Sequence, residues 1–249
     1  MFLPVKDQHD ESAYLDMEFG YVYGTSRAVM MPIEIGAVIH RPGDDSVRYL
    51  WEQFRYGIDV EIWKKVTDSC GRTIGVTTTV ANMGNDEYGM PYDHSFRIPA
   101  GEVRAARETA RNAFGDLRIF MESLLLAGSV KTIVVFAAHM ERKAFRTAEV
   151  SLDGCGLVDL QREIRRHVGM KQVLSLDRLA RLIDFSANGF TISSRNFRYP
   201  IPPGCCHLLD VHRGMGDAVR TFLLAREYQE MLPDLESRIR ALMETCKDG

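Results

Sequence analysis

The stretch KTIVVFAAH at residues 131–139 limits the fold of this chain more than any other segment. A continuous apolar run of strand length is typical of a strand that other elements cover on both faces. Helical patterns surround it, because apolar residues recur at three- and four-residue spacing over 100–128 and again over 140–150, 175–185 and 211–232. We therefore predict that strands and helices alternate in the second half of the chain.

The first half is richer in strand-like sequence. Four segments there have the β-branched and aromatic composition of strands, at 11–24, 32–40, 47–56 and 60–82. Strands followed by alternating strands and helices indicate an α/β fold with a mixed central sheet flanked by helices. No linker-like composition interrupts the chain, so we predict one domain over 1–249, with a core at about 12–232 and a C-terminal helical tail at 233–249.

The composition favours a cytoplasmic protein. No apolar run reaches the roughly 18–20 residues that span a bilayer, and MFLPVKDQHD at the start has no signal-peptide core, so we expect neither membrane association nor secretion. The five cysteines form no C-x-x-C pair, which fits free thiols in a reducing compartment. The net charge of -3 argues against a protein that coats duplex nucleic acid. An enzyme that holds one short strand end with a local basic patch remains compatible with this charge.

Two carboxylates interrupt the apolar sequence of the first predicted strand, YLDMEFG. Asp16 and Glu18 lie two residues apart, so in a strand they point to the same face, while Met17 and Phe19 point to the other. Neighbouring carboxylates near a core repel each other and lose hydration, and bound cations relieve both costs. Oxygen ligands suit Mg²⁺ or Mn²⁺. The alternative is an edge strand on which both acids are solvated.

A second pair of polar residues lies near the other end, in HRGMGDAV. His212 precedes Asp217 by five residues at the glycine-containing start of a predicted helix. Histidine is the natural general base near neutral pH, and the aspartate can hold a metal ion beside it. A histidine that bonds the backbone at a helix entry is the alternative interpretation.

The two motifs, with IEIGAVI between them, resemble the DEDDh class of 3′→5′ exonucleases, the DnaQ-like group of the RNase H-like superfamily. The likeness runs from about Tyr14 to about Tyr228, and HRG-x-x-D is most similar to the branch that trims small interfering RNA and histone-message 3′ ends. That branch commonly has two acids after HRG, and Gly216 stands in place of the first of them. The resemblance implies an RNase H-like sheet and hydrolysis of phosphodiester bonds at single-stranded 3′ ends, with RNA slightly favoured over DNA.

The resemblance also implies a set of site residues. Two divalent ions, Mg²⁺ or Mn²⁺, would be held by Asp16, Glu18, Asp217 and a further acid after the central strand, with His212 as the general base. Glu141 occupies the position of that further acid, where the family has Asp, and Asp159 is its rival.

Three further residues are candidates for substrate contacts. Met17 and Phe19 flank the acids at the place where the family holds the terminal nucleoside, and core packing is the alternative for both. His139 lies two residues before Glu141 and is a candidate for touching a phosphate or a metal-bound water; a histidine bonded to backbone is its alternative.

The expected partner is a single-stranded nucleic acid 3′ end, and a homodimer is the oligomeric state to test. The Glu in place of Asp at position 141 motivates a second hypothesis, in which a nuclease-fold protein binds nucleic acid or regulates with weak or lost activity. A proofreading partner of a polymerase is a third hypothesis.

Overall fold

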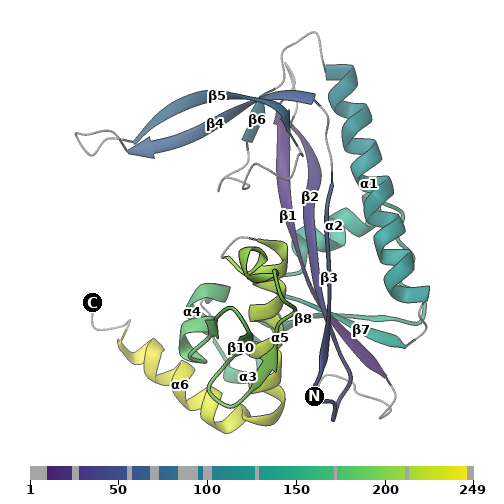
Figure 1. Cartoon of the computed structure of the whole chain (residues 1–249). Helices are drawn as coiled ribbons and strands as arrows, with labels where there is room; N and C mark the ends of the chain where they lie inside the picture. Colours follow the sequence, from purple (N-terminus) through teal and green to yellow (C-terminus); the bar gives the residue numbers. More distant parts are fainter. Residues whose placement is uncertain are drawn as a thin grey trace.

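The computed structural model of the chain describes residues 10–23, 28–54, 58–67, 73–83, 95–97, 103–126, 129–170, 173–210 and 213–245 (Figure 1). Its strands are β1 Glu11–Tyr23, β2 Ala28–His40, β3 Val47–Gln53, β4 Ile58–Thr67, β5 Thr73–Met83, β6 Ser95–Arg97, β7 Val130–Val135, β8 Gly156–Asp159, β9 Ser186–Ala187, β10 Thr191–Ser193 and β11 Arg198–Pro200. Its α-helices are α1 Val103–Leu126, α2 His139–Thr147, α3 Leu160–Val168, α4 Leu176–Leu182, α5 Gly214–Glu230 and α6 Leu232–Thr245, and a 3₁₀ turn covers Cys206–Leu208.

A mixed sheet forms the centre of the fold. Five of its eight strands lie in the spatial order β3-β2-β1-β7-β8, in which β2 is antiparallel to β1 and β3 whereas β1, β7 and β8 are parallel. Strand β6 also pairs with β1, and the antiparallel pair β4 and β5 joins the sheet through β6. The prediction of an α/β fold with a mixed sheet flanked by helices is confirmed.

The central apolar run KTIVVFAAH supplies β7, as predicted, and it is buried on both faces. Ile133 and Val135 belong to a hydrophobic cluster with α1 and α2, whereas Val134 belongs to a second cluster with α3, α4, α5 and α6. Because successive side chains of a strand point to opposite faces, an unbroken apolar run is what a strand between two helical layers requires. We call the two layers the α1 face and the α5 face of the sheet.

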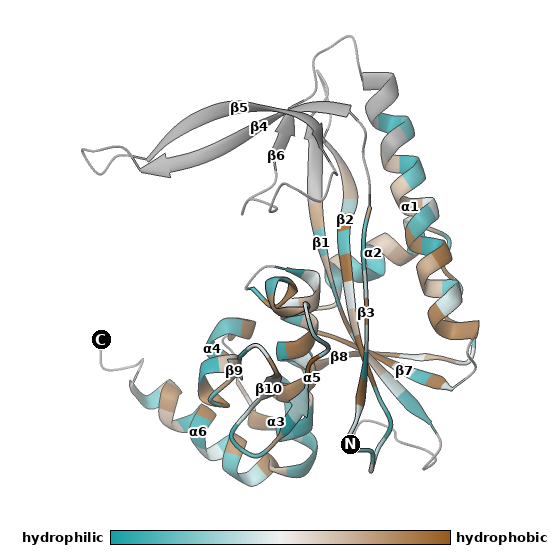
Figure 2. Ribbon diagram, viewed as in Figure 1, coloured by the Kyte–Doolittle hydropathy of each residue, from teal (hydrophilic) through white to brown (hydrophobic). Residues whose placement is uncertain are grey.

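The helices follow from amphipathic sequence. Apolar and polar residues alternate along α1 and α6 (Figure 2), and α1 buries Leu117 and Met121 completely against the sheet. Helix α6, where the sequence predicted a C-terminal tail, buries Leu235 and Ile239 in the cluster of the α5 face. Within the described ranges, no helix is both long and apolar enough to cross a membrane.

Candidate metal centre

The first strand divides its side chains between the two layers. Leu15 and Met17 pack in the cluster of the α1 face, and Phe19 packs against the same cluster. Asp16 and Glu18 alternate with them and therefore lie on the α5 face. Met17 is buried in this cluster, as the core-packing alternative states, whereas Phe19 is only half-buried against it, and nucleoside binding at this place stays a prediction.

The start of α5 rests directly on the backbone of the sheet. Gly36 of β2 pairs with Asp16 of β1, and a Cβ added at Gly36 would lie 2.3 Å from the backbone nitrogen of Met215 in α5. No side chain fits between these two backbones. The close approach places the first turn of the helix, which carries Asp217, next to Asp16.

A second glycine, Gly216, has a similar steric cause. A Cβ there would lie 2.0 Å from the backbone oxygen of Asp210. The extra acid that the related motif carries at this position therefore has no room in this chain. Glycine at 216 lets the segment before α5 fold back against the helix, and Asp217 keeps its place in the first turn.

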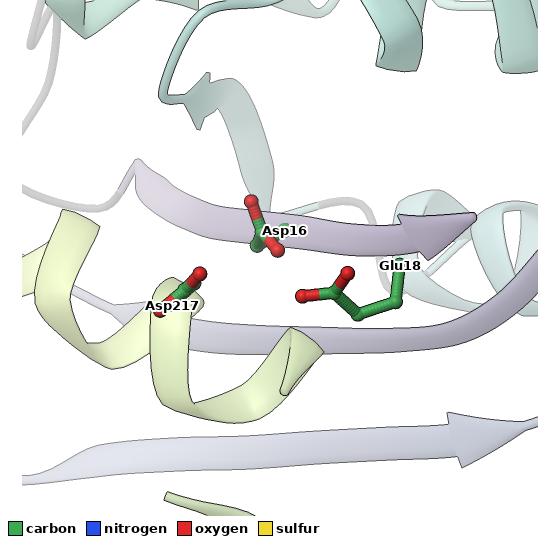
Figure 3. A group of neighbouring side chains, drawn as sticks. All are labelled: Asp16, Glu18 and Asp217. Atoms are coloured by element: carbon green, nitrogen blue, oxygen red, sulfur yellow. The ribbon is translucent and has the colours of Figure 1, made fainter. Parts of the chain in front are cut away.

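The result is a cluster of three carboxylates from opposite ends of the chain. Asp16, Glu18 and Asp217 each offer one oxygen, and these oxygens all lie within 4.8 Å of one another (Figure 3). All three side chains are partly buried. The sequence prediction that these acids meet on one face of the first strand is therefore matched by the geometry.

The electrostatics of this cluster disfavour three negative charges. Burial first, and then the charges of Asp217, Glu141, Glu18 and Glu34, raise the pKa of Asp16 well above its ordinary value. Burial, with Asp217 next, raises the pKa of Glu18 to about 8, although Arg213 opposes this shift. The carboxylates therefore take up protons readily in the metal-free protein, and a bound divalent cation would stabilise their ionised forms.

The fourth acid of the prediction, Glu141, lies in the first turn of α2 and is 5% exposed. Its charge is one of the causes of the raised pKa of Asp16. Burial raises the pKa of Glu141 itself to about 7. Among the described residues, Oε2 of Glu141 has no hydrogen-bond partner. A buried oxygen without a donor is what a ligand to a metal ion, or to water on that ion, would look like before loading.

Asp159, the alternative candidate for the further metal ligand, has a structural role. One of its oxygens accepts a hydrogen bond from the backbone N–H of Arg162 at 3.0 Å and caps α3. The other accepts from the backbone N–H of Ala138 at 3.1 Å. Since both oxygens of Asp159 are occupied by backbone donors, the structure favours Glu141 over Asp159 as the further ligand.

The prediction also included two histidines, His212 and His139. His212, the expected general base, lies outside the described residues. His139 is exposed at the start of α2, two residues before Glu141. The chain turns into α2 through Ala137, whose φ of 59° is uncommon for a residue with a side chain. The backbone therefore bends sharply between the end of β7 and the first turn of α2, which carries Glu141.

Sequence reasoning missed the residues that support the acids. Glu34 of β2 is fully buried and accepts from Nε of Arg213 at 3.1 Å and from the backbone N–H of Gly214 at 2.9 Å, which fixes the start of α5. Arg220 donates to Oδ1 of Asp217 at 3.1 Å and stacks on Phe185. An acid within the apolar stretch PIEIG was the available signal for Glu34. For Arg220, the only available signal was its position three residues after Asp217, which is a spacing that brings side chains together on a helix.

The comparisons with known proteins give no family for this chain. No protein-family model matches it, and no curated protein sequence matches it either.

Proposed function

We propose that the protein is a metal-dependent 3′→5′ exonuclease of the DEDDh type, with an RNase H-like fold, which acts on single-stranded nucleic acid ends. The observation that carries this proposal is the meeting of Asp16, Glu18 and Asp217 within 4.8 Å on one face of the sheet. The mixed sheet with helices on both faces is compatible with the fold that the proposal requires.

The donor set supports Mg²⁺ or Mn²⁺ as the cofactor. All the candidate ligands are carboxylates, and hard divalent cations prefer oxygen. The buried Oε2 of Glu141, which has no hydrogen-bond partner among the described residues, is compatible with a role as a ligand. Asp16, Glu18 and Asp217 would hold one ion, and Glu141 would help to hold a second. Bound ions would supply Lewis-acid stabilisation of the phosphate and a lower pKa for water.

The residues of the chain would then serve hydrolysis as follows. His212 takes a proton from the attacking water, whose oxygen forms a bond to the terminal phosphorus. The bond from that phosphorus to the 3′-oxygen of the preceding nucleotide breaks, and that oxygen is protonated as the shortened strand leaves. The buried acids keep their places because Glu34 with Arg213, and Arg220, hold the start of α5.

A second candidate is a nuclease-fold protein that binds nucleic acid or regulates, with weak or lost activity. Arg220 favours it, because its guanidinium already offsets the charge of Asp217 in the metal-free protein. Glu141 also favours it, since glutamate is longer than the aspartate that the resemblance leads one to expect.

The test is cleavage of single-stranded RNA and DNA oligonucleotides labelled at either end, with Mg²⁺, with Mn²⁺ and with EDTA. We expect stepwise shortening from the 3′ end that requires metal and is absent in Asp16→Asn. Asp45→Asn, the same change at an exposed aspartate, should cleave as wild type does. In His212→Ala we expect a rate lower by about 10²–10⁴-fold, the usual contribution of a general base.

Two results would decide against the proposal. Cleavage by Asp16→Asn at the wild-type rate would show that the acids are not the site. Absence of cleavage of either polymer, with Mn²⁺ binding retained in wild type and lost in Asp16→Asn, would support the regulatory candidate. The relative rates on RNA and DNA test the expected slight preference for RNA.

A further inference from the structure

A groove lies on the α1 face of the sheet, the face opposite the acids. It has a volume of about 430 Å³ and runs between α1 and the end of α2. Its lining is Arg107, Ala110, Arg111, Phe114, Gly115, Arg118, Thr147, Ala148 and Glu149. None of these residues belongs to the acidic cluster, so the groove is a separate feature of the surface.

The charge of the groove is concentrated on α1. Arg107, Arg111 and Arg118 are spaced by four and seven residues, which places three guanidinium groups on one face of the helix. At a rise of about 1.5 Å per residue they cover about 16 Å of its length. The lining contains one acid, Glu149. The chain as a whole has a net charge of -3, so this groove is a local concentration of positive charge.

Two of the three arginines form no ion pair in the described part of the chain, and the third forms only an exposed one. In the described part of the chain, no carboxylate pairs with Arg107 or Arg111, and both side chains are exposed. Arg118 lies 3.8 Å from Glu122, four residues on, with both side chains about half exposed. Such a pair is weak in water and is readily exchanged for a stronger partner.

Gly115 is the glycine in the lining of the groove. It lies in the interior of α1, where glycine is less favourable than alanine. A Cβ added at Gly115 would meet no atom within 4 Å, so packing does not require glycine there. An unfavourable residue that packing does not explain, in the lining of a positively charged groove, is a second indication that the space itself has a use.

We propose that this groove binds the sugar-phosphate backbone of a single-stranded nucleic acid. Guanidinium groups bind phosphate through paired N–H donors, and a positively charged groove that follows a strand is the usual device for sequence-independent binding. The choice of nucleic acid over an acidic protein segment rests on the proposed function. The groove would hold a part of the strand away from the end that is cut, and so would act on affinity rather than on the chemical step.

The test measures binding without cleavage. A fluorescein-labelled single-stranded RNA of about 20 nucleotides, which is long enough to fill the groove, is titrated with the full chain in EDTA. Fluorescence anisotropy is followed at several salt concentrations. The test variant is Arg107→Gln/Arg111→Gln/Arg118→Gln. Its matched control is Arg162→Gln/Arg178→Gln/Arg181→Gln, which removes the same charge from exposed positions of α3 and α4.

We expect the test variant to bind at least about tenfold more weakly. Its slope of log K against log salt should fall by about 2, at about 0.7 for each lost phosphate contact of a single strand. The control variant should bind as wild type does. Gly115→Leu, which fills the groove without a change of charge, should also weaken binding, and Glu149→Gln should tighten it.

Equal weakening in the test and control variants, or unchanged binding in Gly115→Leu with helicity retained, would overturn the proposal. So would a polyglutamate peptide that binds as tightly as the RNA and loses its binding in the test variant, because the groove would then be a surface for acidic protein. Cleavage assays with metal are separate: RNA binding through the groove without cleavage in wild type would contradict the exonuclease and leave the groove standing.

Discussion

The acidic cluster and the groove with three arginines lie on opposite faces of the sheet, in different surroundings. On the α5 face, Asp16, Glu18 and Asp217 are partly buried beneath a helix that touches the backbone of β2. On the α1 face, Arg107 and Arg111 are exposed above a fully apolar interior. The acids are held by fixed partners such as Arg220, whereas the arginines line open space.

In the proposed functions of the two sites, phosphate groups would be bound in two ways, through metal ions on carboxylates and directly by guanidinium groups. Buried carboxylates that lack hydrogen-bond donors are stabilised by a bound cation, and the fold has to fix their positions. Exposed guanidinium groups need no partner to be stable, because water solvates them, and they offer affinity without strict geometry. Changes at the buried contacts between α5 and the sheet should therefore affect folding strongly, and changes at the exposed residues of α1 should affect it little.

The largest effect on folding is expected for Gly36→Ala. The added Cβ would lie 2.3 Å from the backbone nitrogen of Met215, so α5 has to move away from the sheet. We expect a loss of about 3 kcal/mol or more in the free energy of unfolding, measured by urea denaturation. A variant as stable as wild type would show that α5 does not rest on β2 as described.

A smaller loss is expected for Glu34→Ala, which removes the partner of Arg213 and of the backbone N–H of Gly214. We expect about 2–3 kcal/mol, since a fully buried carboxylate that accepts two hydrogen bonds is lost. The matched change on the other face is Glu122→Ala, which breaks an exposed pair with Arg118 and should cost less than about 1 kcal/mol. Similar losses in the two variants would contradict the contrast between the faces.

The stability of the metal-free protein should depend on pH because of the acids. The pKa of Glu18 is raised from 4.5 to about 8, so between these values the folded state binds more protons than the unfolded state. Stability then falls as pH rises through this window and levels off above it. We expect the Tm in EDTA to fall between pH 5 and pH 8.

Two comparisons sharpen this measurement. Adding Mg²⁺ or Mn²⁺ at pH 8 should raise the Tm, because a cation stabilises the ionised carboxylates. Asp16→Asn, which removes one charge next to Glu18, should flatten the dependence on pH. A Tm in EDTA that rises from pH 5 to pH 8 would show that the acids do not destabilise the metal-free fold.

The smallest effect is expected for Gly115→Ala on the α1 face, and it has the opposite sign to that of Gly36→Ala. No atom lies within 4 Å of the added Cβ, and alanine is the better helix former. We expect the free energy of unfolding to rise by about 0.5–1 kcal/mol. Destabilisation would mean that α1 lies closer to its neighbours than the structure shows.

Local sequence was enough to predict several parts of the site. The spacing of two placed Asp16 and Glu18 on one face, because side chains of a strand alternate. The unbroken apolar run predicted a central strand with cover on both sides, and it is β7. The two substrate candidates on the same first strand were harder to judge. Met17 and Phe19 fit either a core or a nucleoside; Met17 is buried in the core of the α1 face, whereas Phe19 is half-buried at its margin.

The residues that hold the acids in place could not be predicted from the local sequence pattern. Glu34 and Arg213 are far apart in sequence and meet because α5 crosses β2 at Gly36. The choice between Glu141 and Asp159 also depended on packing, since only the fold shows that backbone donors occupy both oxygens of Asp159. In the sequence, Glu141 follows the central strand and Asp159 lies in the later segment GLVDLQ, and only the resemblance favoured Glu141.

The sequence by itself determined the main helices, the longer strands and which side chains share a face, because these depend on periodicity over a few residues. The short strands β9, β10 and β11 were not among the predicted elements. The tertiary structure placed Asp217 beside Asp16 and Glu18, which the sequence implied only through a resemblance, and it alone showed that three arginines of α1 border an open groove. Both arrangements depend on how closely helices approach the sheet and each other. That distance is set by side-chain volume at contacts such as Gly36 with Met215, which no local pattern reveals.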